Sequence, residues 1–147
     1  YLVVVDETEE AKAALRFAAR RAASTGGTVE ILSIIPQQEF VEWGGVQAAI
    51  EEEAKLRAEA AVVAASGSIV EEAGIRPSIT VKQGDPVKAV NEILKERDNI
   101  AAFVLGAAAE GAPGPLVGHF CASAGTLPCP LMIVPGSLSE EALDRLS

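Results

Sequence analysis

The sequence predicts a single α/β domain built on a parallel β-sheet with helices packed on both of its faces. Short apolar and β-branched runs alternate with helical patterns four times before a last strand and a terminal helix. The chain has 147 residues, the length of one domain, and no repeat or linker divides it. Because helices that connect parallel strands cross over the sheet with one handedness, residues 1–147 are expected to form one three-layer sandwich.

Five segments carry the pattern of strands. Residues 1–5 and 29–35 are continuous apolar runs of the kind that is buried on both faces of a parallel sheet. Residues 101–105 and 131–134 repeat that pattern later in the chain. Residues 77–81 are more polar, which predicts a strand at the edge of the sheet.

The first and third helices are marked by their start signals. Residues 6–8 form an acidic, Thr-containing cluster that is typical of a helix start, and Asp85-Pro86 combines an N-cap residue with proline at the first helical position. A stripe at 4-3-4 spacing follows the first signal: Ala11, Leu15, Ala18 and Ala22. After Asp85, we expect Val90, Ile93 and Leu94 to face inward.

The second helix is predicted to be the longest element, over about residues 46–74. Its most regular apolar stripe has 4-3-4-3 spacing and comprises Leu56, Ala60, Val63, Gly67 and Val70. Glycine weakens a helix by roughly 1 kcal/mol relative to alanine, so Gly67 is expected to mark a weak point in one helix.

Two short helices are expected toward the C-terminus. The first covers about residues 118–124 and follows a loop rich in Gly, Ala and Pro over residues 107–117. The second runs through Leu146 and is expected to start at a capping-box pattern, Ser137 with Glu140.

The charge and the cysteine and histidine content of the chain exclude several classes of binding partner. The net charge of −9 argues against nucleic acid and anionic membranes, which both reward a basic face. Two cysteines and one histidine lack the number and spacing of a zinc site, so reduced thiols in a cytoplasmic protein are expected. The chain opens within a predicted strand, so we expect a short N-terminal piece to be missing from it.

Ligands of open parallel sheets bind beyond the carboxyl ends of the strands. The most informative loop there contains Gly106, Gly111, Gly114 and Gly118 and runs into a helix start. Glycine can turn several backbone N–H groups toward one point, which is chemistry for binding phosphate. The same glycines can equally serve a turn alone, and both interpretations stay open.

Asp6 is the second candidate, at the end of the first strand. Its carboxylate could accept hydrogen bonds from an adenine amino group or a ribose hydroxyl. Alternatively, Asp6 or Thr8 caps the first helix.

Signatures of several enzyme classes are absent from the sequence. It contains neither a phosphate-binding P-loop nor the Gly-x-Ser-x-Gly turn of α/β-hydrolases. The third strand ends in Val81-Lys82-Gln83, without the aspartate of a receiver domain. We therefore expect a protein that is not an enzyme, with no catalytic residue and no metal.

Taken together, these motifs resemble the universal stress protein family. Val5-Asp6-Glu7-Thr8 is similar to its Val-Asp-x-Ser, and Gly84-Asp85-Pro86 to the start of its third helix. Gly106 stands where its Gly-x2-Gly-x9-Gly-[Ser/Thr] motif begins, and Pro128-Cys129-Pro130 resembles its ending. The resemblance covers essentially the whole chain.

The resemblance implies a five-stranded parallel sheet of order 3-2-1-4-5, the adenine nucleotide alpha hydrolase-like fold. It also implies a homodimer paired through the fifth strand, Leu131, Met132, Ile133 and Val134. In the ATP-binding branch of the family, the aspartate and main chain near Ile34 contact adenine, and the glycine motif holds ribose and phosphates. The implied site for ATP or another adenine nucleotide is Asp6, Thr8, Ile34, Gly106, Ala107, Ala109, Gly118 and His119.

Three departures from the family motif concern the phosphates. Ala109 stands at the second glycine, Gly118 arrives one residue early, and His119 replaces the Ser/Thr hydroxyl. Alanine tolerates a positive φ poorly, so Gly111 or Gly114 would have to supply the turn.

The leading hypothesis is a stress-associated dimeric binding or regulatory module with a degenerate nucleotide site. A second hypothesis is an interaction protein that binds no nucleotide and uses the region of Phe40 and Trp43 or the dimer surface. Slow ATP hydrolysis is the weaker third hypothesis.

Overall fold

The computed structural model describes residues 1–36 and 44–147, with side chains throughout except at residues 44–47. The region of Phe40 and Trp43, invoked by the second hypothesis, lies outside the described residues.

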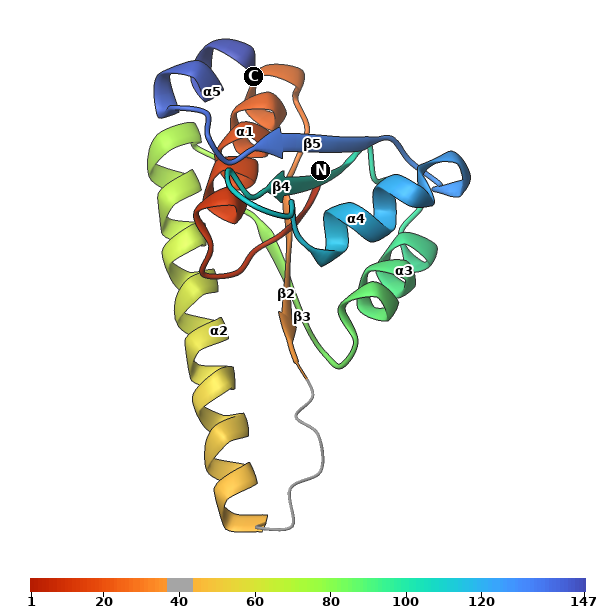
Figure 1. The fold of residues 1–147 in the computed structure, drawn as a ribbon. Helices are drawn as coiled ribbons and strands as arrows, with labels where there is room; N and C mark the ends of the chain where they lie inside the picture. Colours follow the sequence, from red (N-terminus) through yellow and green to blue (C-terminus); the bar gives the residue numbers. More distant parts are fainter. Residues whose placement is uncertain (37–43) are drawn as a thin grey trace.

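Five parallel strands form one sheet in the order β3-β2-β1-β4-β5, which confirms the predicted topology (Figure 1). At the centre, Val3 of β1 pairs with Ile31 of β2 on one side and Val104 of β4 on the other. The polar third strand lies at an edge, as expected, with Ile79 and Val81 exposed there. The strands are β1 (Leu2–Val4), β2 (Glu30–Ile35), β3 (Ser78–Gln83), β4 (Phe103–Ala107) and β5 (Leu131–Pro135).

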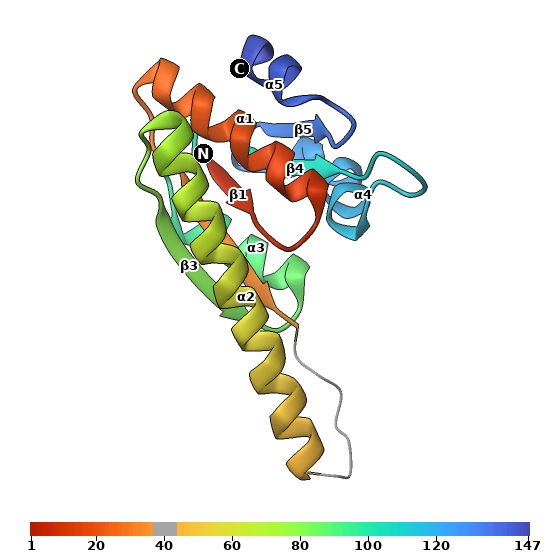
Figure 2. The same cartoon turned by 90° about the vertical axis from the view of Figure 1, so that its left-hand side faces the viewer.

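Helices cover both faces of the sheet (Figures 1 and 2). On one face lie α1 (Glu9–Thr25), α2 (Gly44–Ala73) and the terminal helix α5 (Glu140–Leu146); on the other lie α3 (Pro86–Glu96) and α4 (Pro115–Ala122). A 3-10 turn (Ala124–Thr126) follows α4. The chain is therefore the expected three-layer sandwich.

Two apolar clusters, one on each face, hold the layers together. Successive strand residues point to opposite faces, so Val3 and Val104 join the cluster under α1 while Leu2 and Phe103 join the one under α4. The predicted stripe of α1 is buried, and Leu15, Ala18 and Ala22 belong to the first cluster. In the second, the rings of Phe103 and Phe120 pack edge to face with centroids 5.2 Å apart.

Side-chain caps start three of the helices. Thr8 accepts a hydrogen bond from the Ala11 amide at 3.2 Å, and Asp85 accepts one from the Lys88 amide at 3.0 Å. The last helix differs from expectation. Its N-cap is Ser139, which accepts from the Ala142 amide at 3.1 Å, so the prediction of Ser137 as the capping residue was wrong.

The start of α4 also corrects the sequence analysis. The helix begins at Pro115, three residues before the predicted Gly118, with Gly114 as its N-cap at φ 119°. Proline supplies no N–H and holds a helical φ, which suits the first helical position. Gly118 and His119 therefore lie in the second turn and not at the helix start.

The second helix is continuous, as predicted, and its regular stripe faces away from the sheet. Val62 and Ile69 are buried against the sheet, whereas Leu56, Val63 and Val70 are 56%, 72% and 43% exposed. The intervening Ala60 and Gly67 are exposed as well. Alanines at 58, 61 and 65 let the opposite side of α2 pack closely, so the smaller residues cover the core.

Neither cysteine is paired: Cys121 is exposed, and Cys129 is partly buried, which raises the pKa of its thiol. Among the described residues, no group of three or more His, Cys, Asp or Glu side chains is arranged to hold a metal ion. In the same part of the chain, no helix combines the length and apolarity needed to cross a membrane.

Candidate functional site

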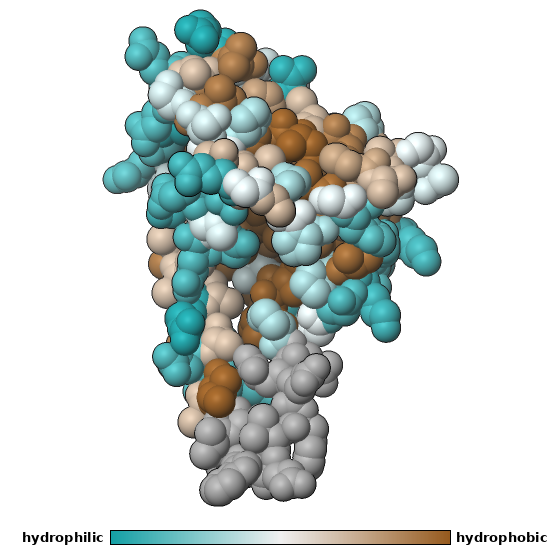
Figure 3. All heavy atoms as spheres, in the orientation of Figure 1, coloured by the Kyte–Doolittle hydropathy of each residue, from teal (hydrophilic) through white to brown (hydrophobic). Residues whose placement is uncertain are grey.

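A cavity of about 720 Å³ opens beyond the carboxyl ends of β1, β2 and β4. The starts of α1, α3 and α4 and one side of α2 complete its walls. Figure 3 shows it as a hollow between α2 and the rest of the molecule. The sheet order explains the position, because β1 and β4 are neighbours from which the chain winds in opposite directions, leaving a crevice between their loops.

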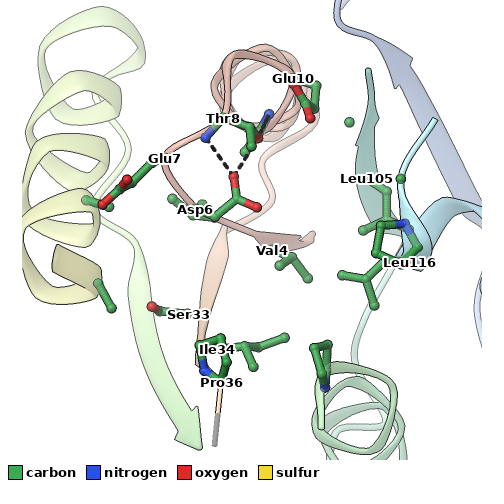
Figure 4. A pocket seen from close by; sticks show the side chains of 18 of the residues that line it. Val4, Asp6, Glu7, Thr8, Glu10, Ser33, Ile34, Pro36, Leu105 and Leu116 are labelled. Carbon is green, nitrogen blue, oxygen red and sulfur yellow. Dashed lines mark hydrogen bonds between the residues drawn. The ribbon is translucent and has the colours of Figure 1, made fainter. Parts of the chain in front are cut away.

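Asp6 stands at the end of β1 and lines this cavity (Figure 4). Its Oδ1 accepts hydrogen bonds from the Thr8 amide at 2.8 Å and from the Thr8 hydroxyl. Thr8 in turn caps α1. Asp6 therefore stabilises the loop before α1 and is not itself the N-cap. This division leaves the second carboxylate oxygen of Asp6 as an acceptor for a ligand.

Ser33 is a cavity residue that the sequence analysis missed. The residue is only 2% exposed, and it lies on the cavity wall. Figure 4 shows this hydroxyl directed toward α2, while Ile34 and Pro36 lie beside it on the wall. The signal was a single hydroxyl within the apolar run of residues 29–35. A hydroxyl on the cavity wall can donate a hydrogen bond to a ligand or accept one from it.

Gly106 lines the cavity, and no larger residue fits at this position. A Cβ on this residue would lie 2.0 Å from the carbonyl oxygen of Glu10. The end of β4 therefore packs directly on the backbone of α1. In this chain, the glycine serves close packing of α1 against the sheet.

The loop after β4 forms its turns at other glycines than the family motif suggests. Gly111 and Gly114 have positive φ values of 72° and 119°, whereas Ala109 does not. The Ala108 amide donates to the carbonyl of Pro113 at 3.1 Å, which closes the loop on itself. The glycine that opens the helix is thus Gly114, beside the cavity.

The eight predicted site residues separate into two groups. Asp6, Thr8, Ile34 and Gly106 line one cavity. The other four lie away from its lining: Ala107, Ala109, Gly118 and His119. His119 is exposed and packs edge to face on Phe120, and Gly118 is exposed with open space around it. The structure therefore brings Asp6, Thr8, Ile34 and Gly106 together on one cavity, and it leaves the other residues of the glycine motif outside the lining.

The charges around the cavity are mainly negative. Asp6, Glu7, Glu10 and Asp85 line it, and the only cation among the described lining residues is Arg57 of α2. Arg57 is already paired with Glu53 at 3.0 Å. In the described lining there is no His, Cys or Lys. Such a field favours amino and hydroxyl groups of a ligand over multiple phosphates.

The sheet order and the crevice at its switch point define a parallel α/β domain of the adenine nucleotide alpha hydrolase-like fold. A model of the universal stress protein family matches residues 1–135. The chain therefore belongs to this family.

Solved structures of the family share the fold at low sequence identity. The universal stress protein UspA from Lactobacillus plantarum aligns with a TM-score of 0.75 and 17% identity, covering 90% of this chain and 94% of that one. A universal stress protein in complex with cAMP aligns at 0.62 and 18%, covering 92% and 96%. The Archaeoglobus fulgidus protein in complex with dAMP also aligns at 0.62 and 18%, covering 90% and 94%. A comparison with curated proteins finds no match.

Proposed function

We propose that the crevice binds an adenine nucleotide with one phosphate or none, and that the chain acts as a binding or regulatory module without catalysis of its own. The observation that carries the proposal is the convergence of Asp6, Ser33 and Gly106 on one cavity at the switch point. Its volume of about 720 Å³ lies within the usual range of small-molecule sites. Family members whose structures contain cAMP or dAMP support the choice of an adenine ligand.

Adenine recognition rests on the free oxygen of Asp6. The 6-amino group is a donor, and a carboxylate oxygen is an acceptor that needs no rearrangement of the Thr8 contacts. Val4, Ile34 and Leu116 supply apolar walls for the flat faces of the base (Figure 4). The hydroxyl of Ser33 offers a second polar contact.

The number of phosphate groups that the site can hold is limited by the backbone N–H donors in the first turn of α4. Proline has no N–H at position 115, and the Gly118 amide already donates to the Gly114 carbonyl at 3.0 Å. The amides of Leu116 and Val117 remain as donors, helped by the helix dipole. Two amides suit one phosphate group, whereas further phosphates would meet Glu7, Glu10 or Asp85.

Calorimetric titration with adenosine, AMP and ATP–Mg²⁺ tests the proposal. We expect AMP or adenosine to bind more tightly than ATP. Asp6→Ala should weaken that binding roughly ten- to hundred-fold, the value of a hydrogen bond to a charged group. Asp98→Ala, an exposed aspartate outside the cavity lining, serves as the matched control. Tighter binding of ATP would overturn the phosphate argument, and binding of none of the three would overturn the adenine assignment.

We further propose that two copies pair through β5. The sheet ends at this strand, whose Leu131, Met132 and Ile133 are only partly buried. An apolar edge with unpaired backbone groups is a liability that pairing with a second strand removes.

A further inference from the structure

We infer that the outward face of α2 is a second contact between copies of this chain, in which two α2 helices pack antiparallel about a two-fold axis. The face is the stripe Leu56, Ala60, Val63, Gly67 and Val70, which we call the α2 stripe. Figure 2 shows α2 on the viewer's side of β2 and β3 with no element in front of it. The contact differs from the β5 pairing, because α2 lies on one face of the sheet whereas β5 forms one of its edges.

The stripe has the spacing and length of a helix-pairing surface. Its 4-3-4-3 pattern is the one that two helices use when side chains of each fit between those of the other. From Leu56 to Val70 it extends about 21 Å at the helical rise of 1.5 Å per residue. The core does not use this pattern, since α2 buries the other side with Val62 and Ile69.

Gly67 has no explanation within the single chain. It lies in the interior of a continuous helix, its φ is not positive, and a Cβ would meet no atom within 4 Å. Glycine is among the poorest helix formers, and neither a cap nor a packed neighbour accounts for it here. A glycine on an exposed helix face permits another helix to approach closely, with the two axes about 8 Å apart.

The arrangement of sizes selects a second copy in antiparallel orientation. Along the stripe, large and small residues alternate. When the two-fold axis passes midway between Val63 and Gly67, Val63 faces Gly67 of the second copy and Ala60 faces its Val70. Leu56 then faces Gly74, the residue after the helix. Each large side chain thus meets a small one, whereas parallel pairing would place large on large and leave gaps between the small residues.

The flanking charges agree with the same alignment. Arg57 and Glu71 are both exposed on one side of the stripe, directly after Leu56 and Val70. In the antiparallel pair, Arg57, which is paired with Glu53 of its own chain, lies near Glu71 of the second copy at both ends of the contact. On the other side, Glu59 falls beside Ala73, so no like charges meet. A self-complementary surface of this kind is what a two-fold contact requires.

Disulfide trapping tests the geometry in a background with both native cysteines replaced by serine. Ala60→Cys and Val70→Cys, mixed under mild oxidation, should form a mixed disulfide, because these positions face each other across the pair. Each variant alone should cross-link poorly, since its own copies lie about 15 Å apart along the helix. The control is Glu52→Cys mixed with Val70→Cys. Glu52 is exposed on the same helix but lies about 12 Å along the helix from the position that faces Val70.

Sedimentation equilibrium supplies the second measurement. Gly67→Gln should remove the α2 contact and halve the mass of the largest assembly while the melting temperature stays equal or rises. Val63→Asp should do the same, and Ala48→Asp, which adds the same charge at an exposed position off the stripe, should not. Efficient cross-linking of either single variant alone, no excess of mixed disulfide over the control, or an unchanged mass for Gly67→Gln would each overturn the inference.

Discussion

Asp6 shows how one side chain can serve both the loop and a ligand. One of its carboxylate oxygens holds the Thr8 amide and hydroxyl, and the other faces the cavity. The two oxygens become unequal when the residue is changed to an amide. That asymmetry allows the chemistry of the ligand to be probed directly.

We predict that Asp6→Asn changes which purine is preferred. The Asn oxygen must accept from the Thr8 amide, so its NH₂ group, a donor, takes the place of the free oxygen. Adenine, which presents an amino donor there, should bind about ten-fold more weakly or worse, while a 6-oxo purine nucleotide should gain relative to it. Calorimetry with AMP and IMP measures the ratio. An unchanged ratio would show that Asp6 does not contact position 6 of the base.

Two glycines give opposite predictions for stability. Gly106→Ala places a Cβ against the Glu10 backbone, which cannot move without shifting α1, so we expect a loss of about 3 kcal/mol or more. Gly118→Ala adds a methyl group to open space in a helix and should gain up to about 1 kcal/mol. Urea unfolding compares them. Because Gly118 does not line the cavity, its variant should leave nucleotide affinity unchanged, and a large loss of affinity would return Gly118 to the site.

At the scale of elements, α5 is the shortest α-helix in the described part of the chain, and it depends on a docking contact. Arg16 of α1 donates from Nε and from a terminal nitrogen to the two oxygens of Asp144, at 2.8 and 2.9 Å. The same guanidinium lies 2.7 Å from Glu72 of α2, so one side chain joins α1, α2 and α5. Leu143 of α5 is also buried, in the core cluster that includes α1. A short isolated helix does not persist in water, so these interactions hold it in place.

We predict that this contact makes part of the stability depend on pH. The hydrogen bonds from Arg16 hold the pKa of Asp144 below its ordinary value. A carboxyl group with a lowered pKa stabilises the fold at neutral pH and loses that contribution as the pH falls through the lowered pKa. Asp144→Asn should therefore unfold more easily at neutral pH, with a difference from the natural chain that shrinks in acid. Urea unfolding across the acid range measures this, and Glu141→Gln on the same helix is the control. A difference that stays constant with pH would contradict the prediction.

For the assembled molecule, the two proposed contacts use different surfaces: the edge of the sheet at β5, and the outward side of α2 on one face of the sheet. The carbonyl of Pro130 accepts from the Phe103 amide, so in the alternating pattern of a parallel pair the N–H of Ile133 points away from β4. That N–H is then available to a second strand across the β5 edge.

We predict that Ile133→Pro removes the β5 pairing while the sheet itself survives. Proline deletes the outward N–H without removing a bond to β4. Ile133→Val keeps the N–H and should pair normally, at a cost to stability of about 1 kcal/mol. Sedimentation of both variants, with circular dichroism to verify folding, measures the effect. A folded Ile133→Pro chain of unchanged mass would refute pairing through this edge.

Much of the fold follows from local patterns in the chain. Strands such as residues 1–5 are apolar on both faces, and Asp85-Pro86 starts a helix by side-chain and backbone chemistry that needs no distant partner. The same kind of local information identified Asp6, because a polar residue directly after a buried strand lies at the edge of a parallel sheet. The strands and this helix start depend on residues close together in sequence, and they were predicted correctly.

Other features depend on contacts between distant segments. The helical period of α2 reveals an apolar stripe but not which neighbour it faces, and the sheet is covered by Val62 and Ile69 instead of the α2 stripe. The role of Gly106 rests on Glu10, and the hydroxyl of Ser33 acquires a meaning only from the cavity around it. The alternation of strands and helices thus determined the class of fold and the end of the sheet where a ligand would bind. Which residues line that cavity was decided by packing between α1, α2, α4 and the strand ends, because side chains distant in sequence converge only when the chain is folded.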